Sequence, residues 1–164
     1  RRPRLHQEVL SLAALVADLQ RLWTPTLALH HIHFHMEAPD PCILFVDRKQ
    51  MEQIFINLVN NAVDAMPEGG EIHLQVAADS TSRPASPRWS FRLTDTGSGI
   101  PSELLAKVFK PMFTTKPEGK GTGLGLAIVR EIIRAHGGEV HIESQEGQGT
   151  SVLFTLPGVT TLEA

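Results

Sequence analysis

A glycine-rich run leads directly into an apolar, helix-like stretch in the last third of this 164-residue chain. Residues 119–126 read Gly-Lys-Gly-Thr-Gly-Leu-Gly-Leu, and the apolar stretch continues to His136. Successive glycines let backbone N–H groups converge without interference from Cβ atoms, and a helix N-terminus adds a partial positive charge. The run is therefore typical of a phosphate site. It matches neither the dinucleotide fingerprint nor the P-loop, because Lys120 precedes a glycine and no glycine set reads G-x-G-x-x-G.

Length and charge limit the classes of protein that this chain can belong to. A chain of 164 residues suits one domain with one core. The formal net charge of −3, with both signs interspersed, argues against general attraction to nucleic acid or anionic lipid. The single cysteine, Cys42, excludes an internal disulfide and a multi-cysteine zinc site, and it fits a reducing compartment.

No apolar run approaches the roughly 18 residues that a membrane span requires. We therefore expect a soluble, cytoplasmic domain with no direct membrane contact, in a parent protein that can itself be anchored. The chain begins in the middle of a pattern, which suggests a fragment of a longer protein.

Hydrophobic periodicity predicts three long helices. Ser11 is suited to cap a helix over Leu12–Leu29, and Asp47 is suited to cap a second, with Gln50 completing a capping-box-like start. The third covers residues 123–136, after the glycine run, and a short helix is predicted over residues 101–108.

Alternating or continuous apolar runs predict seven strands, mostly joined as hairpins. They cover residues 5–10, 32–36, 42–46, 71–77, 88–95, 139–144 and 150–156, and Pro157 is expected to close the domain. The predicted fold is an α/β two-layer sandwich, with a mixed, mostly antiparallel sheet covered on one face by three helices.

The second predicted helix has an amide-rich face opposite its apolar stripe. Gln53, Asn57, Asn60, Asn61 and Asp64 recur on it at steps of three and four. Asparagine is unfavourable inside a helix because its side chain competes for backbone hydrogen bonds. Either the face is simply solvated, or Asn57 and Asn61 present oxygens to a hard cation such as magnesium that bridges phosphates.

An aspartate interrupts the apolar face of the strand over residues 88–95. Trp89, Phe91 and Leu93 share that face with Asp95. Burial of an unpartnered carboxylate costs several kcal/mol. Asp95 therefore needs donors, which are either local backbone N–H groups or a ligand amino group such as that of a purine.

A row of histidines alternates with apolar residues in the strand over residues 32–36. His31, His33 and His35 could chelate nickel or zinc, because side chains two apart share a strand face. No nearby cysteine or obvious acidic ligand supports a metal site in the sequence. The alternation favours an ordinary polar strand face.

Four motifs follow one another in a specific order. They are the amide-faced helix, Asp-Thr-Gly-Ser-Gly-Ile at 95–100, Phe-Lys-Pro-Met-Phe-Thr-Thr-Lys at 109–116, and the glycine run. This order resembles the catalytic and ATP-binding domain of sensor histidine kinases, within the gyrase, Hsp90, histidine kinase and MutL superfamily. There the segments are the N box, first glycine box, F box and second glycine box.

The resemblance spans essentially the whole chain and implies the Bergerat ATP-binding fold. It implies a single catalytic domain over residues 1–164, with 1–10 as the junction from a missing dimerisation domain and 109–122 as the ATP lid. Residues 60–66 and 113–116 are most similar to the nitrogen-regulator group of these kinases.

ATP and Mg²⁺ are the cofactors that the resemblance implies. Asn61 would be the magnesium ligand, and Asn57 beside it would support the metal and phosphates. Asp95 would accept from the adenine amino group, and Thr150 would contact adenine directly or through water. The other implied ATP contacts are Ala65, Gly97, Gly99, Ile100, Thr115, Lys116, Lys120, Gly121, Thr122, Gly123, Leu124, Gly125 and Leu126.

Two positions depart from the family pattern. Asp64 and Pro111 stand where many histidine kinases have basic residues. Lys116 and Lys120 remain as candidates for neutralising the β- and γ-phosphates, or they are solvated lid charges. Lys116 therefore joins Asn57 and Asn61 as a candidate catalytic residue.

Asn57 separates two kinds of chemistry. In the superfamily's ATP hydrolases and serine-directed kinases, a glutamate at this place activates the nucleophile. An amide cannot act as a general base at neutral pH, whereas a neutral imidazole is already nucleophilic. Asn57 therefore favours a histidine acceptor over water.

The acceptor is expected on another domain, because none of the eight histidines lies in the family's phosphoacceptor sequence. The resemblance implies transfer of the γ-phosphoryl group to a histidine on the protein's own dimerisation domain, and then to the receiver domain of a response regulator. The fragment alone should be nearly inactive. The alternatives are a self-sufficient ATPase of the same superfamily and a nucleotide-binding interaction module without transfer activity.

Overall fold

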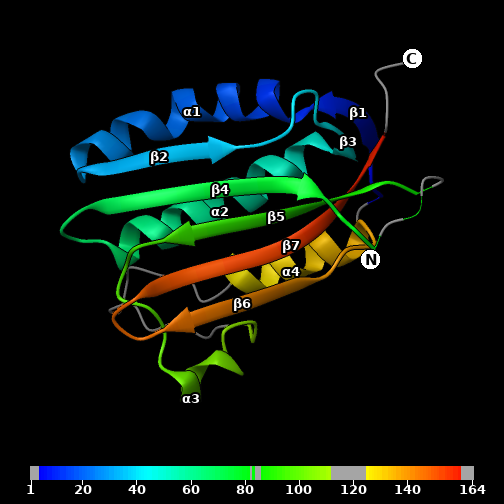
Figure 1. Cartoon of the computed structure of the whole chain (residues 1–164). Coiled ribbons are helices and arrows are strands. Elements are labelled where there is room, and N and C mark those ends of the chain that lie inside the picture. Colours follow the sequence, from blue (N-terminus) through cyan, green and yellow to red (C-terminus); the bar gives the residue numbers. More distant parts are fainter. Residues whose placement is uncertain (1–3, 82, 84–85, 112–124, 160–164) are drawn as a thin grey trace.

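The computed structural model describes residues 4–81, 83, 86–111 and 125–159. They form a sheet of seven strands with α1, α2 and α4 packed against one face, as Figure 1 shows. The predicted two-layer α/β sandwich is confirmed. The elements are β1 (Gln7–Ser11), α1 (Leu12–Leu29), β2 (Ile32–Glu37), β3 (Ile43–Asp47), α2 (Arg48–Ala65), β4 (Gly70–Ala78), β5 (Arg88–Asp95), α3 (Ser102–Leu105), α4 (Gly125–Ala135), β6 (Val140–Gln145) and β7 (Gly149–Val159).

The sheet has the strand order β1-β3-β7-β5-β4-β2, and β6 also pairs with β7. All pairs are antiparallel except β2 with β4, which is parallel. Residues 7–10 of the predicted junction belong to β1, which pairs with β3. Within the part of the chain that the structure describes, no helix combines the length and the hydrophobicity of a membrane span.

β7 is longer than predicted, because Pro157 does not end it. Along one edge, β7 pairs with β6 as far as Phe154 and with β3 from Gly158 onward. Along the other edge, β7 pairs with β5 as far as Pro157. Pro157 thus falls between the two ladders, where its missing N–H removes no hydrogen bond. α3 is shorter than predicted, because the chain after Leu105 continues as turns. In these turns the N–H groups of Lys107 and Lys110 donate to carbonyl oxygens three residues earlier.

Three aromatic rings join α2 to the centre of the sheet. Phe91 of β5 and Phe154 of β7 are Cα partners, and their rings stack with centroids 4.9 Å apart. Phe55 of α2 packs against both, at 6.2 and 6.3 Å. All three side chains are fully buried. This cluster fixes the register of β5 on β7. In that register, Asp95, which is four residues after Phe91 on β5, lies opposite Thr150.

Both predicted helix caps are present. The Ser11 side chain accepts a hydrogen bond from the N–H of Ala14, and the Asp47 side chain accepts one from Gln50. The reciprocal half of the capping box is absent, because Asp47 N–H donates to Nε2 of His136 instead. Oε1 of Gln50 is buried without a hydrogen-bond partner.

His136 therefore connects the start of α2 to the end of α4. Its Nε2 accepts from Asp47 N–H at 3.1 Å, so its Nδ1 carries the hydrogen and donates to Ile132 O at 2.8 Å. The bond to Ile132 O satisfies one of the last carbonyl groups of α4. The bond from Asp47 N–H to His136 links the start of α2 to the end of α4 and so holds these two helices together.

We expect His136→Ala to lower the free energy of unfolding by about 2–3 kcal/mol, because it leaves the buried N–H of Asp47 without its partner and removes one of the two donors to Ile132 O. Urea denaturation measures the change. The matched control is His141→Ala, whose exposed side chain lies on β6, with an expected change within about 0.5 kcal/mol. Equal losses in the two variants would contradict a stabilising role for the His136 contacts.

Candidate functional site

The structure brings residues from four parts of the chain to one end of the sandwich (Figure 1). They come from the C-terminal half of α2, the loop after β5, the start of β7 and the first turn of α4. At this end, at the left of the view, β5 finishes and β7 begins.

Asp95 lies at the end of β5, with only 7% of its surface exposed. Its Oδ1 accepts a hydrogen bond from Gly97 N–H at 2.9 Å, so the local-donor alternative is realised. Burial raises the pKa of Asp95, and the N–H groups of Gly97 and Thr150 lower it only in part. Because the pKa stays above its usual value, the local donors do not fully compensate for the burial of the charge.

The loop after Asp95 packs directly on the last residue of α2. A Cβ at Gly97 would lie 2.6 Å from the carbonyl oxygen of Ala65, closer than real Cβ atoms approach. Ser98 N–H donates to that same oxygen at 3.1 Å. Gly97 thus allows the loop to cap α2 and to bring Asp95 and Ala65 together.

Gly99 turns the loop toward the β6–β7 hairpin. Its φ is +73°, in the left-handed region, and any Cβ there would collide with the carbonyl oxygen of Gln145. The N–H of Ile100, the next residue, donates to Oγ of Ser144 at 2.7 Å. Ile100 is therefore held beside the hairpin that carries Thr150.

Ser144 is a residue of this region that the sequence analysis missed. Its Oγ accepts from Ile100, donates to Gly149 O at 3.0 Å and lies 2.7 Å from Oγ1 of Thr150. Because the single Ser144 hydrogen goes to Gly149, the hydroxyl hydrogen of Thr150 points to Ser144. The available signal was the hairpin around Gly147, which pairs positions 144 and 150.

The amide side chain of Asn61 faces the start of α4. A Cβ at Gly125 would lie 3.9 Å from its Nδ2 and 4.0 Å from its Oδ1. Asn57, one turn earlier on α2, is half-buried on the same side. Leu126 packs against the core beside this point. A helix N-terminus and two amides thus lie together, as a phosphate and cation site requires.

Several predicted ATP contacts lie outside the described residues. They are Thr115, Lys116, Lys120, Gly121, Thr122, Gly123 and Leu124. Of the predicted lid, residues 109–111 are described, and the ring of Phe109 packs against the core with the Arg130 guanidinium 5.1 Å above it. The predicted roles of the other lid residues stay predictions.

A separate hollow of about 100 Å³ lies between α1 and α2. Trp23, Leu27 and Val59 contribute to its mostly apolar lining. It contains none of the predicted site residues, and its lining does not suit a triphosphate. We therefore place the candidate site at the end of the sandwich and not in this hollow.

Comparisons with known proteins find similar sequences. The family model for histidine kinase-, DNA gyrase B- and HSP90-like ATPases matches residues 46–160. The sensor kinase CckA of Brucella abortus (strain 2308) is 41% identical over 167 residues, which is 96% of this chain and 18% of that protein. The chain spans 18–28% of the length of the first curated relatives, which include three sporulation kinases of Bacillus subtilis (strain 168).

Solved structures also resemble the chain. The catalytic domain of histidine kinase ThkA has a TM-score of 0.79 at 31% identity, and the match covers 94% of this chain and 97% of that domain. ThkA in complex with the response regulator protein TrrA has a TM-score of 0.76 at 29% identity, covering 94% and 42%. Full-length ShkA in complex with AMPPNP has a TM-score of 0.82 at 27% identity, covering 97% and 32%.

The raised pKa of Asp95 predicts the direction of a pH effect. A carboxyl whose pKa is higher in the native state than in the unfolded state costs stability above the native pKa. That cost disappears as the pH falls below the unfolded value. Without nucleotide, wild-type protein should therefore gain stability relative to Asp95→Asn between pH 7 and about pH 4.

Urea denaturation of both proteins at each pH measures this difference. The comparison uses the change with pH, so any effect of the amide that is the same at both pH values cancels. A relative loss of wild-type stability on acidification would mean that the local N–H donors outweigh the burial of Asp95.

Proposed function

The chain belongs to the family of histidine kinase-, DNA gyrase B- and HSP90-like ATPases. We propose that it binds Mg-ATP and transfers the γ-phosphoryl group to a histidine outside residues 1–164. It is an ATP-binding catalytic domain of the sensor histidine kinase type. The observation that carries the proposal is the assembly of Asp95, the α2 amides and the start of α4 at one end of the fold.

Asp95 is the proposed recognition group for adenine. Its carboxylate is buried and its N–H donors compensate only in part, so an additional donor such as the adenine amino group is favourable there. Thr150, opposite Asp95 in the sheet, directs its hydroxyl hydrogen to Ser144. Its remaining lone pairs can accept from adenine or from a bridging water.

Asn61 is the proposed magnesium ligand, and Asn57 supports it. The residues present fit this ion, because amide oxygens are hard ligands and the Asn61 amide lies beside the N-terminal residue of α4. When bound, magnesium would neutralise charge on the phosphate oxygens. The protein's own part is to hold the phosphates at the helix start, where backbone N–H groups attract anions.

The proposed reaction breaks the bond between the γ-phosphorus and its bridging oxygen and forms a bond from phosphorus to an imidazole nitrogen, releasing ADP. Asn57 cannot remove a proton from water at neutral pH, which supports transfer to a histidine over hydrolysis. The site therefore acts by positioning and by neutralising charge. Lys116 and Lys120 are the proposed lid cations.

The proposed partners are the dimerisation domain of the parent protein, which carries the acceptor histidine, and the receiver domain of a response regulator. The complex of the similar kinase ThkA with TrrA supports the second partner. We propose one catalytic domain over residues 1–164, with 1–10 as junction and 109–122 as lid, located in the cytoplasm. Membership of the nitrogen-regulator group is proposed from residues 60–66 and 113–116.

Isothermal titration calorimetry with Mg-AMPPNP tests the two halves of the site. Asp95→Asn should weaken affinity roughly 10- to 100-fold, as expected for loss of a hydrogen bond to a charged group. Asn61→Ala should remove the dependence of affinity on magnesium. The matched control is Asn60→Ala, an exposed neighbour on the same helix, with unchanged binding. Unchanged binding in both site variants would refute the assignment.

Transfer is tested with radiolabelled ATP and the two-helix dimerisation domain of the parent protein. We expect acid-labile label on that domain, lost in Asn61→Ala and kept in Asn60→Ala, with negligible phosphate release by the fragment alone. Acid-stable label would indicate a serine kinase. Robust phosphate release without a partner would indicate a self-sufficient ATPase, and binding without transfer would indicate an interaction module.

A further inference from the structure

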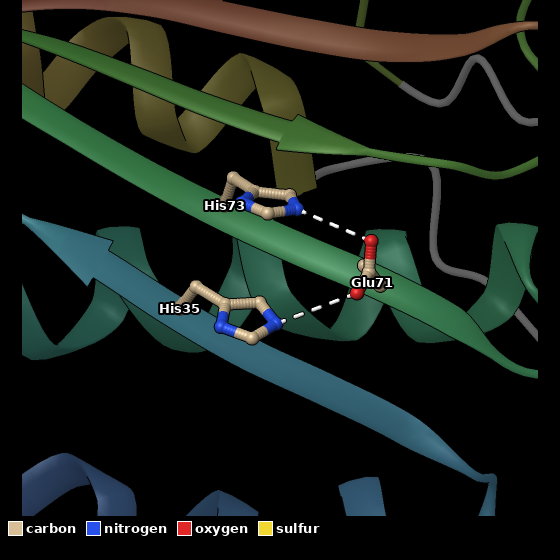
Figure 2. A group of neighbouring side chains, drawn as sticks. All are labelled: His35, Glu71 and His73. Carbon is tan, nitrogen blue, oxygen red and sulfur yellow. Dashed lines mark hydrogen bonds and ion pairs between the residues drawn. The ribbon is translucent and has the colours of Figure 1, made fainter.

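We propose that His35, Glu71 and His73 form a binding site for a divalent transition metal ion of the zinc class, on the face of the sheet opposite the helices. Figure 2 shows the three side chains in front of β2 and β4, with α2 behind the strands. The site shares no residue with the proposed nucleotide site.

The parallel pairing of β2 and β4 brings these residues together. Its register makes His35 the Cα partner of His73 and His33 the partner of Glu71, so all four share one face. Ile72 and Leu74 point to the opposite face and are fully buried. The cluster is thus fixed by the same alternation that builds the core.

The two imidazole rings converge on one carboxylate. They stack with centroids 4.8 Å apart and planes 18° from parallel. Nε2 of His35 lies 3.5 Å from Oε1 of Glu71, and Nε2 of His73 lies 3.4 Å from Oε2. Both rings therefore present the same nitrogen to the space around Glu71, as Figure 2 shows.

These separations are close to those of a tetrahedral site. With metal–ligand distances of about 2.0–2.2 Å, neighbouring ligand atoms lie about 3.3–3.5 Å apart. One ligand atom from each residue lies within 4.8 Å of the others, so closure requires a modest rotation of the rings. Side-chain exposures of 50% for His35 and 41% for His73 leave room for it.

The donor set also selects the class of metal. Two imidazoles and one carboxylate suit zinc and neighbouring transition metals, whereas magnesium prefers oxygen ligands alone. The Glu71 carboxylate is exposed to solvent and is ionised at neutral pH, as a ligand has to be. Solvent can supply the fourth ligand at this exposed face.

No acidic ligand is obvious near the histidine row in the sequence, but the structure places Glu71 beside it. Glu71 is 36 positions from His35 in sequence but lies beside it through the pairing of β2 with β4. The row itself is not the cluster, because His33 contributes no ligand atom to it. The metal would join β2 to β4, the strand with which β2 pairs in the sheet.

The test is calorimetric titration of metal-free, tag-free protein with zinc chloride, together with the visible spectrum of the cobalt(II) form. We expect one equivalent per chain and the intense absorption bands of tetrahedral cobalt. His35→Ala, His73→Ala and Glu71→Gln should each weaken affinity at least about 10-fold. His33→Ala, an exposed histidine on the same strand face, is the matched control and should bind as wild type.

Zinc should also raise the melting temperature of wild type and of His33→Ala, and not that of the three ligand variants, because a ligand that binds only the native state stabilises it. The metal-free melting temperature of each variant shows whether it folds. Zinc binding in His35→Ala equal to wild type, no binding at 1 mM zinc, or an equal loss in His33→Ala would overturn the proposal.

Discussion

The register of β5 on β7 is the constraint on which the candidate site depends. Phe91 and Phe154 stack within the core, and that pairing sets Asp95 against Thr150 at the end of the same ladder. A slip by one residue would move Asp95 to the outer face of the sheet and put Thr94 in its place. The same pairing of β5 with β7 therefore fixes both the packing of the core and the position of the site residues.

Two buried aspartates illustrate how differently the fold treats the same side chain. Asp47 and Asp95 are both 7% exposed. Burial raises the pKa of each, but N–H donors from His6 and Gln50 bring that of Asp47 below its usual value, whereas that of Asp95 stays raised. Asp47 is satisfied within the fold as a helix cap. Local donors compensate only in part for the burial of Asp95, as is common for residues at binding sites.

Local patterns predicted most of the elements and failed where distant segments meet. Ser11 and Asp47 each cap a helix by accepting a hydrogen bond from the N–H three positions later, so the local sequence was sufficient to predict both caps. Gln50 could not complete its capping box because His136, 89 positions from Asp47, takes the N–H. Strand pairing that no local pattern encodes likewise explains three other features. They are the continuation of β7 past Pro157, the contacts of Ser144, and the proximity of His35 to Glu71.

The placement of β7 has a consequence for how the chain acquires its structure during synthesis. β3 and β5 are joined in the sheet only through β7, which is the last described strand to leave the ribosome. Until then β3 and β5 present open edges that can pair with other chains. We therefore expect the nascent chain to hold two separate partial sheets, and to close the sandwich only after translation of residues 149–159.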